Sequence, residues 1–383
     1  MLLRRHKILF AILRPSVIAF LYFKFGYIYK AAKEIPDTCI ILSNHTTDFD
    51  PLFVSVSFRK YIRFIASEHI ARWKHAYKFL DYVFNPIIRY KGANAASTVK
   101  EMLRTINKGV SVCMFAEGSR CWNGITAPID DSTGKVVKRA KCALVTYKIS
   151  GGYFTSPLWS AGGTRKGKIR GQVVNVYTAE QISEMTIDEI NEIINNDLYI
   201  DAYEEMENSP TKYKGKQLAV ALENLLFYCP HCNSIESLFS YKDTVKCKNC
   251  GCSFTYNEYG QINGLKQKNV KELFLWLKHK VENDAKNSVS YSSENACIVS
   301  IKNHIETFLD KGTISLSYNN LTCGNISFEL SEINDMNMHG KNSIVFSTKT
   351  AYYEIKVDDN TSALKFYMLF QAYAFGCINR FSF

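Results

Sequence analysis

Short apolar runs alternate with amphipathic stretches over the first half of the chain, from about residue 38 to residue 178. Uninterrupted apolar runs predict buried strands, and apolar residues repeated every three or four positions predict helices. The predicted strands cover residues 38–43, 61–66, 110–115 and 173–177, and the predicted helices cover residues 51–58, 97–108 and 135–150. This alternation indicates an α/β domain whose mixed sheet is covered by helices on both faces.

The pattern changes after residue 186. An acidic helical stretch (186–209) precedes a basic linker (212–216), and an amphipathic helix follows at 270–281. Residues 313–357 then alternate in the manner of strands separated by turn residues, and a helix is predicted at 362–376. Several strands followed by one helix resemble a pleckstrin-homology (PH)-like or GRAM-like barrel, so a β-rich C-terminal domain of this kind is expected.

The N-terminal segment is apolar, aromatic and basic. Its apolar stretch spans residues 8–29 and contains three interruptions: Arg14, Pro15 and Lys24. The longest uninterrupted run, residues 16–23, is shorter than the ~20 residues that cross a bilayer, and a secretory cleavage site is poorly matched at Phe25-Gly26-Tyr27. We therefore expect an arm lying in the membrane interface, with basic residues at the headgroups. The alternative is a helix packed on the protein's own core.

The overall composition is that of a globular protein. The chain has 383 residues, of which 46% are hydrophobic and 22% are charged, and its formal net charge is +11. A basic surface suits nucleic acid, an anionic membrane or a phosphorylated substrate, and the charge alone does not choose among them. Most of the twelve cysteines are scattered singly without a secretion signal, which indicates a reducing compartment.

The first candidate site is the segment NHTTDFD, residues 44–50, directly after a predicted buried strand. His45 and Asp50 would lie about 140° apart if both were helical. They meet if His45 lies in the loop and Asp50 at the helix start, which Pro51 favours. Asp50 could then accept the Nδ1 proton and leave Nε2 free as a base. Taken alone, the pair is also explained by chance spacing, or by Asp50 serving as a helix N-cap.

The second candidate site is the segment FAEGSRC, residues 115–121, which follows another predicted buried strand. Ligands bind at such strand ends in α/β sheets. Gly118 permits a sharp turn, and the planar guanidinium of Arg120 suits a phosphate group. Taken alone, Glu117 and Arg120 would form an ordinary surface ion pair.

Together, the two segments resemble the motifs of the glycerolipid (lysophosphatidic acid) acyltransferase family, N-H-x4-D and F-P-E-G-T-R. They occur in the family's order and separation, and the resemblance covers roughly residues 30–180. Between them the family has an arginine after an apolar run, matched most simply by Arg89 in the run 86–91. After them it has a proline-containing apolar strand, matched by residues 155–159 with Pro157. Ala116 and Ser119 depart mildly from the family's proline and threonine, and only substrate choice is put in doubt.

The resemblance implies transfer of a fatty acyl group from an acyl thioester (acyl-CoA or acyl carrier protein) to the free hydroxyl of a lysophospholipid. The expected acceptor is 1-acylglycerol-3-phosphate, in phospholipid synthesis. His45 would be the general base and Asp50 its partner, with direct attack of the acceptor on the thioester. The implied substrate-binding residues are Arg89, Glu117, Gly118, Ser119 and Arg120.

Two alternatives stay open at this stage. Another lyso-acceptor, of the ornithine-lipid or lysocardiolipin type, would use the same chemistry. A membrane-tethered binding module would use the domain as a scaffold, and the intact pairs His45/Asp50 and Glu117/Arg120 count against it. The expected location is the cytoplasmic face of a membrane, peripheral or monotopic, with membrane lipids as partners.

Two cysteine pairs form a separate signal: Cys229 with Cys232, and Cys247 with Cys250. Two C-x2-C knuckles separated by fourteen residues predict a zinc ribbon. Four thiolates close a tetrahedral site, so the Zn²⁺ would be structural. Cys252 could replace Cys250, although the knuckle spacing favours Cys250, and a redox pair is the other alternative. The residues between the knuckles do not suggest a nucleic-acid surface, so no nucleic-acid partner is expected.

These signals divide the chain into four parts. Residues 1–30 form the membrane-interface arm, and residues 31–224 form the acyltransferase domain. Residues 225–264 form the zinc ribbon. Residues 265–383 contain a helix followed by the β-rich domain.

Overall fold

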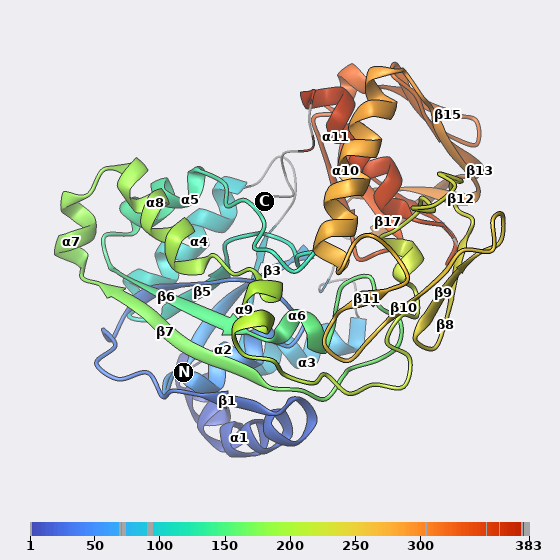
Figure 1. Ribbon diagram of the computed structural model, residues 1–383. Helices are drawn as coiled ribbons and strands as arrows, with labels where there is room; N and C mark the ends of the chain where they lie inside the picture. The colour runs from blue at the N-terminus through green and yellow to red at the C-terminus, as the bar shows by residue number, and fades with distance from the viewer. Residues whose placement is uncertain are drawn as a thin grey trace. The chain divides into compact units, whose positions relative to one another are not determined.

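The computed structural model divides the chain into two compact units (Figure 1). The first comprises Met1–Pro157 and Thr164–Tyr213, and the second comprises Leu158–Gly163 and Lys214–Phe383. The residues that the structure describes are 2–68, 70, 74–89, 95–302, 305–349, 351–359, 361–376 and 378.

The first unit is built around a seven-stranded mixed sheet of order β1-β7-β6-β2-β5-β3-β4. Its strands are β1 (Tyr27–Tyr29), β2 (Cys39–Ser43), β3 (Ile62–Ser67), β4 (Ile87–Arg89), β5 (Ser111–Phe115), β6 (Ala143–Ser150) and β7 (Ile169–Tyr177). Strands β6, β2, β5, β3 and β4 are parallel, whereas β7 is antiparallel to β6 and parallel to β1. The expected α/β domain with a mixed sheet is confirmed.

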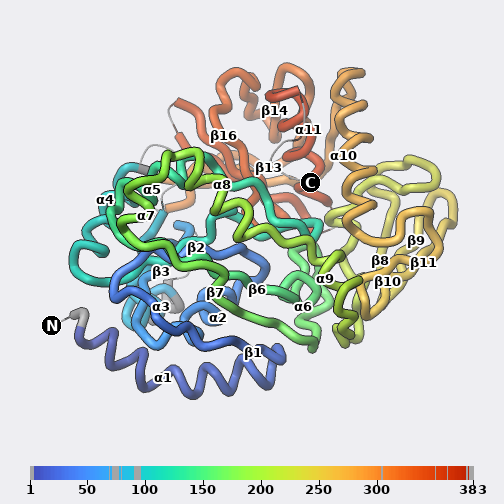
Figure 2. The backbone as a smooth tube through the Cα atoms, turned by 60° about the vertical axis from the view of Figure 1, so that its left-hand side comes forward, coloured from blue at the N-terminus to red at the C-terminus, as the bar shows by residue number. Residues whose placement is uncertain are grey.

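Helices cover both faces of this sheet (Figure 2). The helices are α1 (Leu2–Phe25), α2 (Asp50–Ser57), α3 (Lys74–Phe84), α4 (Ala95–Asn107), α5 (Ser132–Ala140), α6 (Gly152–Thr155), α7 (Ala179–Glu184), α8 (Ile187–Leu198) and α9 (Ala202–Asn208). The central strand β2 feeds two cores: Cys39 and Ile41 pack with residues of α1 and α2, and Ile40 and Leu42 pack with residues of α4, α5 and α8. Both faces of β2 are buried, which explains its uninterrupted apolar sequence.

Two predicted elements between residues 135 and 159 are wrong. The helix expected over residues 135–150 ends at Ala140, where Lys141 takes a left-handed conformation (φ 50°), and the chain continues as β6. Because β6 is buried along most of its length, it lacks the alternation that distinguishes a strand from a helix. The strand expected over residues 155–159 is also missing, since α6 ends at Thr155 and an irregular turn follows.

The N-terminal helix α1 is continuous through Pro15, which interrupts the apolar sequence but not the helix. The span Arg4–Phe25 is long and apolar enough to cross a bilayer by length and composition, with a mean hydropathy of 1.8. One stripe of α1 packs on the first unit through His6, Leu21 and Phe25. The opposite side exposes large apolar side chains: Ile8, Ile12, Leu13, Phe20, Tyr22 and Phe23.

The second unit begins with a small antiparallel sheet of order β11-β10-β9-β8, at the right of Figure 2. A 3-10 turn (η2, Leu222–Asn224) precedes it, and its strands are β8 (Leu238–Tyr241), β9 (Thr244–Cys247), β10 (Ser253–Tyr256) and β11 (Ile262–Asn263). The paired cysteines lie in and beside these strands, at the positions where the sequence predicts a ribbon.

The rest of the second unit is β-rich, as predicted. After α10 (Val270–Lys286), seven antiparallel strands form a sheet of order β15-β14-β13-β12-β18-β17-β16, and the chain then forms α11 (Ala363–Phe375). The strands are β12 (Tyr291–Lys302), β13 (Ile305–Leu316), β14 (Asn320–Cys323), β15 (Ile326–Glu329), β16 (Asp335–His339), β17 (Ser343–Ser347) and β18 (Tyr352–Lys356), with a 3-10 turn η3 (Leu330–Glu332). The sheet therefore begins well before residue 313, where the sequence predicts its start.

Candidate active site

The two sequence motifs begin side by side because β2 and β5 are neighbouring parallel strands. Ser43, the last residue of β2, pairs with Phe115, the last residue of β5. Strand β4 ends at Arg89 and is joined to β5 through the parallel strand β3. The carboxyl ends of parallel strands lie at one edge of a sheet, which is where ligands bind in α/β folds. All three predicted segments therefore reach the same edge.

His45 and Asp50 form the expected pair. The Nδ1 atom of His45 lies 2.9 Å from Oδ2 of Asp50, which is fully buried at the first turn of α2. The Asp50 carboxylate also accepts the backbone N–H groups of Thr46 and Thr47 and the Thr47 hydroxyl, the last at 2.7 Å. With the carboxylate fixed as an acceptor, Nδ1 donates to it, and Nε2 is the nitrogen that can take a proton.

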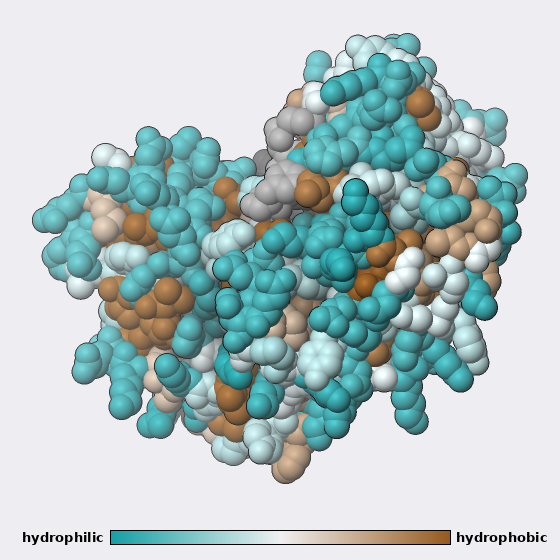
Figure 3. All heavy atoms as spheres, in the orientation of Figure 1, coloured by the Kyte–Doolittle hydropathy of each residue, from teal (hydrophilic) through white to brown (hydrophobic). Residues whose placement is uncertain are grey.

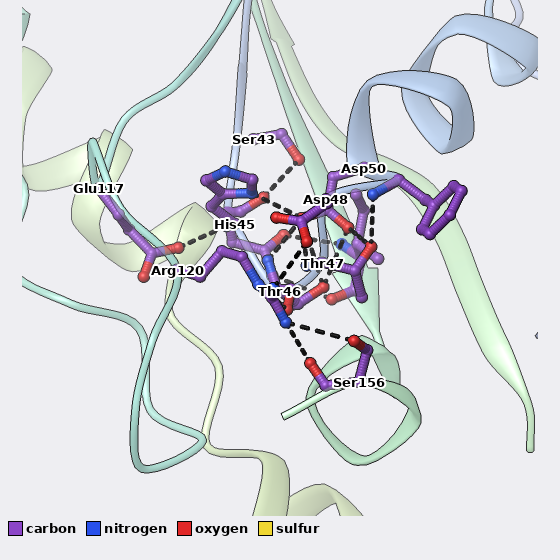
Figure 4. Close-up of polar contacts among 12 residues, drawn as sticks. Ser43, His45, Thr46, Thr47, Asp48, Asp50, Glu117, Arg120 and Ser156 are labelled. Carbon is purple, nitrogen blue, oxygen red and sulfur yellow. Dashed lines mark hydrogen bonds and ion pairs between the residues drawn. The ribbon is translucent and has the colours of Figure 1, made fainter. Parts of the chain in front are cut away.

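The His45 ring is also supported from its face. It stacks on the Phe115 ring at 4.4 Å between centroids and 21° between planes, and its side chain is 20% exposed. Figure 4 shows His45 on the loop after β2 and Asp50 near the start of the helix that follows. The imidazole is thus held by a carboxylate and an aromatic ring while part of it stays accessible.

Asn44 has a role that the sequence reasoning missed. Its amide nitrogen donates to the carbonyl of Ile149 at 2.9 Å, and its amide oxygen accepts the Ile149 N–H at 2.8 Å. This double hydrogen bond ties the start of the His45 loop to β6. The signal that could have found it is the position of a buried amide directly after a buried strand.

Glu117 holds the backbone of the same loop. Its Oε1 accepts the His45 N–H at 2.6 Å, and its Oε2 accepts the Ala127 N–H at 2.7 Å. Burial of the carboxyl raises the pKa of Glu117 to about 8, an effect that these two backbone hydrogen bonds partly oppose. Both oxygens have backbone partners, so the geometry gives Glu117 a positioning role toward His45.

Arg120 contacts the loop that carries His45, through Thr46 and Asp48. Its Nε donates to the Thr46 carbonyl at 3.1 Å, and its Nη1 pairs with Asp48 at 3.0 Å. Its Nη2 donates to the carbonyl of Ser156, as Figure 4 shows. The guanidinium therefore joins the His45 loop to the turn after α6. Of these contacts, the one with Asp48 is nearest the solvent, because the Asp48 side chain is 78% exposed.

Arg89, at the end of β4, comes close to Gly118 of the second motif. Gly118 has a φ of +71°, and a Cβ atom added there would lie 3.2 Å from Nη1 of Arg89. Glycine at this position thus permits both the left-handed turn and the close approach of the guanidinium. Arg89, Gly118 and Ser119 are exposed, whereas Tyr90 and Lys91 of the predicted run lie outside the described residues.

A second glycine supports the loop from the β6 side. A Cβ atom added to Gly152, the first residue of α6, would lie 2.1 Å from the Thr46 hydroxyl oxygen. Any larger residue would displace the segment that carries His45. Sequence reasoning did not select Gly152, and the adjacent pair Gly151-Gly152 is the signal it could have used.

The four predicted cysteines of the second unit also come together. The Sγ atoms of Cys229, Cys232, Cys247 and Cys250 all lie within 4.8 Å of one another. The sulfur pairs Cys229/Cys250 and Cys232/Cys247 are each 3.8 Å apart. A tetrahedral site with Zn–S bonds of about 2.3 Å has sulfur–sulfur edges of about 3.8 Å, so the arrangement fits a metal of that size. Cys250, not Cys252, completes this cluster.

The two knuckles are built alike. The carbonyl of Cys229 accepts the Asn233 N–H at 2.9 Å, and the carbonyl of Cys247 accepts the Gly251 N–H at 3.1 Å. Asn233 and Gly251 both have positive φ, so each knuckle closes on a left-handed residue. This shared turn directs both cysteines of a knuckle toward one point.

An α/β domain that holds a histidine–carboxylate pair at the carboxyl edge of its parallel strands has the geometry of a general-base enzyme. Comparison with known proteins gives the family: residues 29–150 match the family model for acyltransferases. Over these residues the chain is similar to the acyltransferase family.

The similarities to solved structures are distant. The 1-acyl-sn-glycerophosphate (LPA) acyltransferase PlsC from Thermotoga maritima aligns at 16% identity and a TM-score of 0.41, covering 52% of this chain and 78% of that protein. The N-terminal PH domain of human ARAP2 aligns at 12% identity and a TM-score of 0.17, covering 22% of this chain and 83% of that domain. No curated protein matches the chain.

Proposed function

We propose that the protein transfers a fatty acyl group from an acyl thioester to the free hydroxyl of a lysophospholipid, with 1-acylglycerol-3-phosphate as the preferred acceptor. The observation that carries the proposal is the contact between His45 Nδ1 and Asp50 Oδ2, at 2.9 Å, within a domain of the acyltransferase family. The motif residues around this contact support it, because they fix the loop without covering the imidazole.

In this mechanism Nε2 of His45 removes the proton of the acceptor hydroxyl. Asp50 keeps the imidazole in the required tautomer and stabilises the imidazolium that forms. The alkoxide attacks the thioester carbonyl directly, the C–S bond breaks, and the imidazolium returns its proton to the departing thiolate. A positioned general base of this kind contributes about 10²–10⁴ in rate.

The acceptor's phosphate would be held at the exposed edge of the site. Arg89 supplies an exposed guanidinium beside Gly118 and Ser119. Arg120 supplies a second guanidinium, whose side chain is only 10% exposed. Its Nη1 pairs with the exposed carboxylate of Asp48, and a phosphate could take that carboxylate's place. Glu117 would act through the His45 backbone.

Helix α1 would hold the enzyme in the interface of a membrane, on its cytoplasmic face. Its exposed apolar side suits the acyl region, and seven lysines and arginines precede the first acidic residue of the chain, Glu34. Arg14 and His6, on the opposite stripe, hydrogen-bond to carbonyls of the first unit. A helix bound along the protein in this way is better suited to lie in the interface than to cross the bilayer.

The cysteine cluster would bind a structural Zn²⁺. The sulfur–sulfur distances of 3.8 Å support this assignment, because they match a tetrahedral tetrathiolate site. When bound, the ion joins the two knuckles and leaves no position open for a substrate.

The assay that tests the function follows thiol release from long-chain acyl-CoA with lysophosphatidic acid in detergent micelles. His45→Ala should lower kcat by about 10²–10⁴-fold. Asp50→Asn should also lower kcat strongly, while Asp48→Asn, which changes the neighbouring exposed carboxylate, should retain kcat within a few-fold. Equal turnover of His45→Ala and the unmodified protein would show that the base assignment is wrong.

The alternatives are separated by changing the substrates in the same assay. The acyl thioester of acyl carrier protein replaces acyl-CoA as the donor. Lyso-ornithine lipid or lysocardiolipin replaces lysophosphatidic acid as the acceptor. Faster turnover with one of these acceptors would reassign the substrate and keep the mechanism. Lack of transfer with every donor and acceptor would favour a binding module.

A further inference from the structure

The ribbon sheet of the second unit has one face that carries exposed aromatic residues. In β8, Leu238 is buried whereas Phe239 and Tyr241 are 39% and 68% exposed. Lys246 of β9 stands directly opposite Phe239 in the pairing register. Elsewhere, on the side of the molecule drawn in Figure 3, apolar residues form small patches within a hydrophilic surface. Within the four-residue strand β8, Phe239 and Tyr241 share one exposed face.

Three exposed lysines accompany the aromatic residues: Lys242, Lys246 and Lys248. The Nζ atom of Lys242 lies 5.2 Å from the centre of the Tyr241 ring, and that of Lys248 lies 5.9 Å from the centre of the Phe239 ring. Each aromatic ring is thus paired with an ammonium group at the distance of a cation–π contact. These five residues, Phe239, Tyr241, Lys242, Lys246 and Lys248, are called the ribbon face below.

Three carboxylates on or next to the ribbon strands have partners within the second unit. Asp243 accepts the Leu218 N–H at 2.8 Å, and Glu223 accepts the Ser240 hydroxyl at 2.9 Å. Glu236 pairs with the buried Lys365 at 2.8 Å. The three lysines of the ribbon face are therefore available to an anionic partner.

The ribbon face is also held rigidly. Lys246 and Lys248 flank Cys247, one of the four clustered cysteines, so a metal bound there fixes the strand that carries them. Lys242 lies in the hairpin turn with a φ of 53°, and its carbonyl accepts the Ala219 N–H at 2.9 Å. A non-glycine residue held at positive φ requires support from its surroundings. The hydrogen bond to the Lys242 carbonyl provides part of that support.

We propose that the ribbon face docks on the surface of an anionic phospholipid bilayer. Aromatic rings favour the headgroup level of a membrane, and lysines are attracted to anionic lipids. Single-stranded nucleic acid also combines stacking rings with phosphates. The bilayer is favoured because the chain presents a second apolar and basic surface on α1, and because of the proposed function, on which this inference rests.

The test is amine-reactive labelling of the full, metal-loaded chain on vesicles, read for each lysine by mass spectrometry. Vesicles of phosphatidylcholine with phosphatidylserine should lower the labelling of Lys242, Lys246 and Lys248 several-fold compared with phosphatidylcholine alone. Two exposed lysines of the same unit, Lys286 and Lys349, serve as internal controls and should label equally in both. Equal labelling of all five lysines on the two kinds of vesicle would overturn the proposal.

Variants provide a second measurement. Lys246→Gln with Lys248→Gln should weaken binding to anionic vesicles by roughly 10- to 30-fold, which corresponds to about 1 kcal/mol per lysine. Lys286→Gln with Lys349→Gln removes the same charge from the control positions and should have a much smaller effect. An equal loss for the two double variants would indicate net charge alone and would contradict the docking proposal.

Two further outcomes separate this inference from its rivals. If an oligonucleotide protects the ribbon face and anionic vesicles do not, the partner is nucleic acid and the proposal fails. Acyl transfer in detergent micelles is measured in parallel, because it does not require docking. Protection without any acyl transfer would refute the proposed function and leave the docking surface in place.

Discussion

The environment of the Glu117 carboxyl group affects both the stability of the protein and the position of His45. It is enclosed at the end of β5, and burial raises its pKa to about 8. At the same time it accepts the N–H groups of His45 and Ala127. An ionised carboxylate makes the stronger hydrogen bonds, whereas burial favours the neutral acid. The protonation of Glu117 therefore influences how firmly the His45 loop is held.

The direction of the pH effect follows from the raised pKa. Between pH ~4.5 and ~8 the folded protein keeps the Glu117 proton that the unfolded chain releases, so the Glu117 contribution to stability declines as the pH rises through this window. Compared with Glu117→Gln, the unmodified protein should lose up to about 1.4 kcal/mol per pH unit in its free energy of unfolding. Urea unfolding at several pH values measures the slope for each protein.

The quantity compared is the slope of the unfolding free energy against pH. Absolute stabilities are not compared, because Glu117→Gln also loses one of the two backbone contacts. Glu192→Gln, an exposed change on α8, is the matched control and should keep the slope of the unmodified protein. Infrared difference spectroscopy gives a direct reading, since the carboxyl band that titrates near pH ~8 should be missing in Glu117→Gln. Parallel slopes for Glu117→Gln and the unmodified protein would contradict the assignment.

At the scale of elements, helix α1 braces the helix that begins with Asp50. The guanidinium of Arg14 donates to the carbonyl of Val56, near the end of α2, at 2.7 Å from Nη2 and 3.1 Å from Nε. The same Nη2 also donates to the Tyr29 hydroxyl. A cation at the C-terminal end of a helix satisfies a free carbonyl and favours the helix dipole. The apolar N-terminal helix is thereby connected to the catalytic pair through α2.

Arg14→Gln should therefore reduce both stability and turnover. Loss of a charged hydrogen bond to a partly buried carbonyl costs about 1–3 kcal/mol, and α2 should become less firmly placed. Arg4→Gln, an exposed change on the same helix, removes the same charge and should leave kcat in micelles close to that of the unmodified protein. Thermal unfolding and kcat are measured for both variants, and equal effects would show that Arg14 contributes charge alone.

The elements also show what the sequence could and could not predict. Strands β2 and β5 are apolar runs that end directly before a motif, so both the strands and the place of the site could be predicted. The boundary between α5 and β6 could not, because a buried strand after a helix continues its apolar pattern. Strand β12 was missed since polar residues occupy its exposed positions and several of its buried ones are small. The bonds of Asn44 and Glu117 are to backbone atoms, which a sequence pattern does not specify.

At the scale of the whole molecule, each unit has its own means of stabilisation. In the first, two apolar cores sandwich the mixed sheet. In the second, the ribbon strands are two to four residues long, which is too short for a sheet to be stable without a further constraint. Glu236 of the ribbon also pairs with the buried Lys365 of α11, so the ribbon supports the β-rich part of its unit. The stability of the second unit should consequently depend on metal.

Removal of the metal should affect the two units unequally. A chelator, or Cys232→Ser, should abolish bound zinc and expose the cluster thiols to titration. Hydrogen exchange should increase in β8–β11. It should also increase in α11, because Lys365 loses its fixed partner Glu236. The cores of the first unit contain no residue of the cluster, so this unit should keep its protection from hydrogen exchange. Acyl transfer in micelles should change less than about twofold, which is the deviation usual between distant, independent sites. Cys297→Ser, a cysteine of β12 outside the cluster, is the matched control and should retain the metal. Unchanged protection of the ribbon strands after zinc has been removed would show that the cluster does not stabilise this unit.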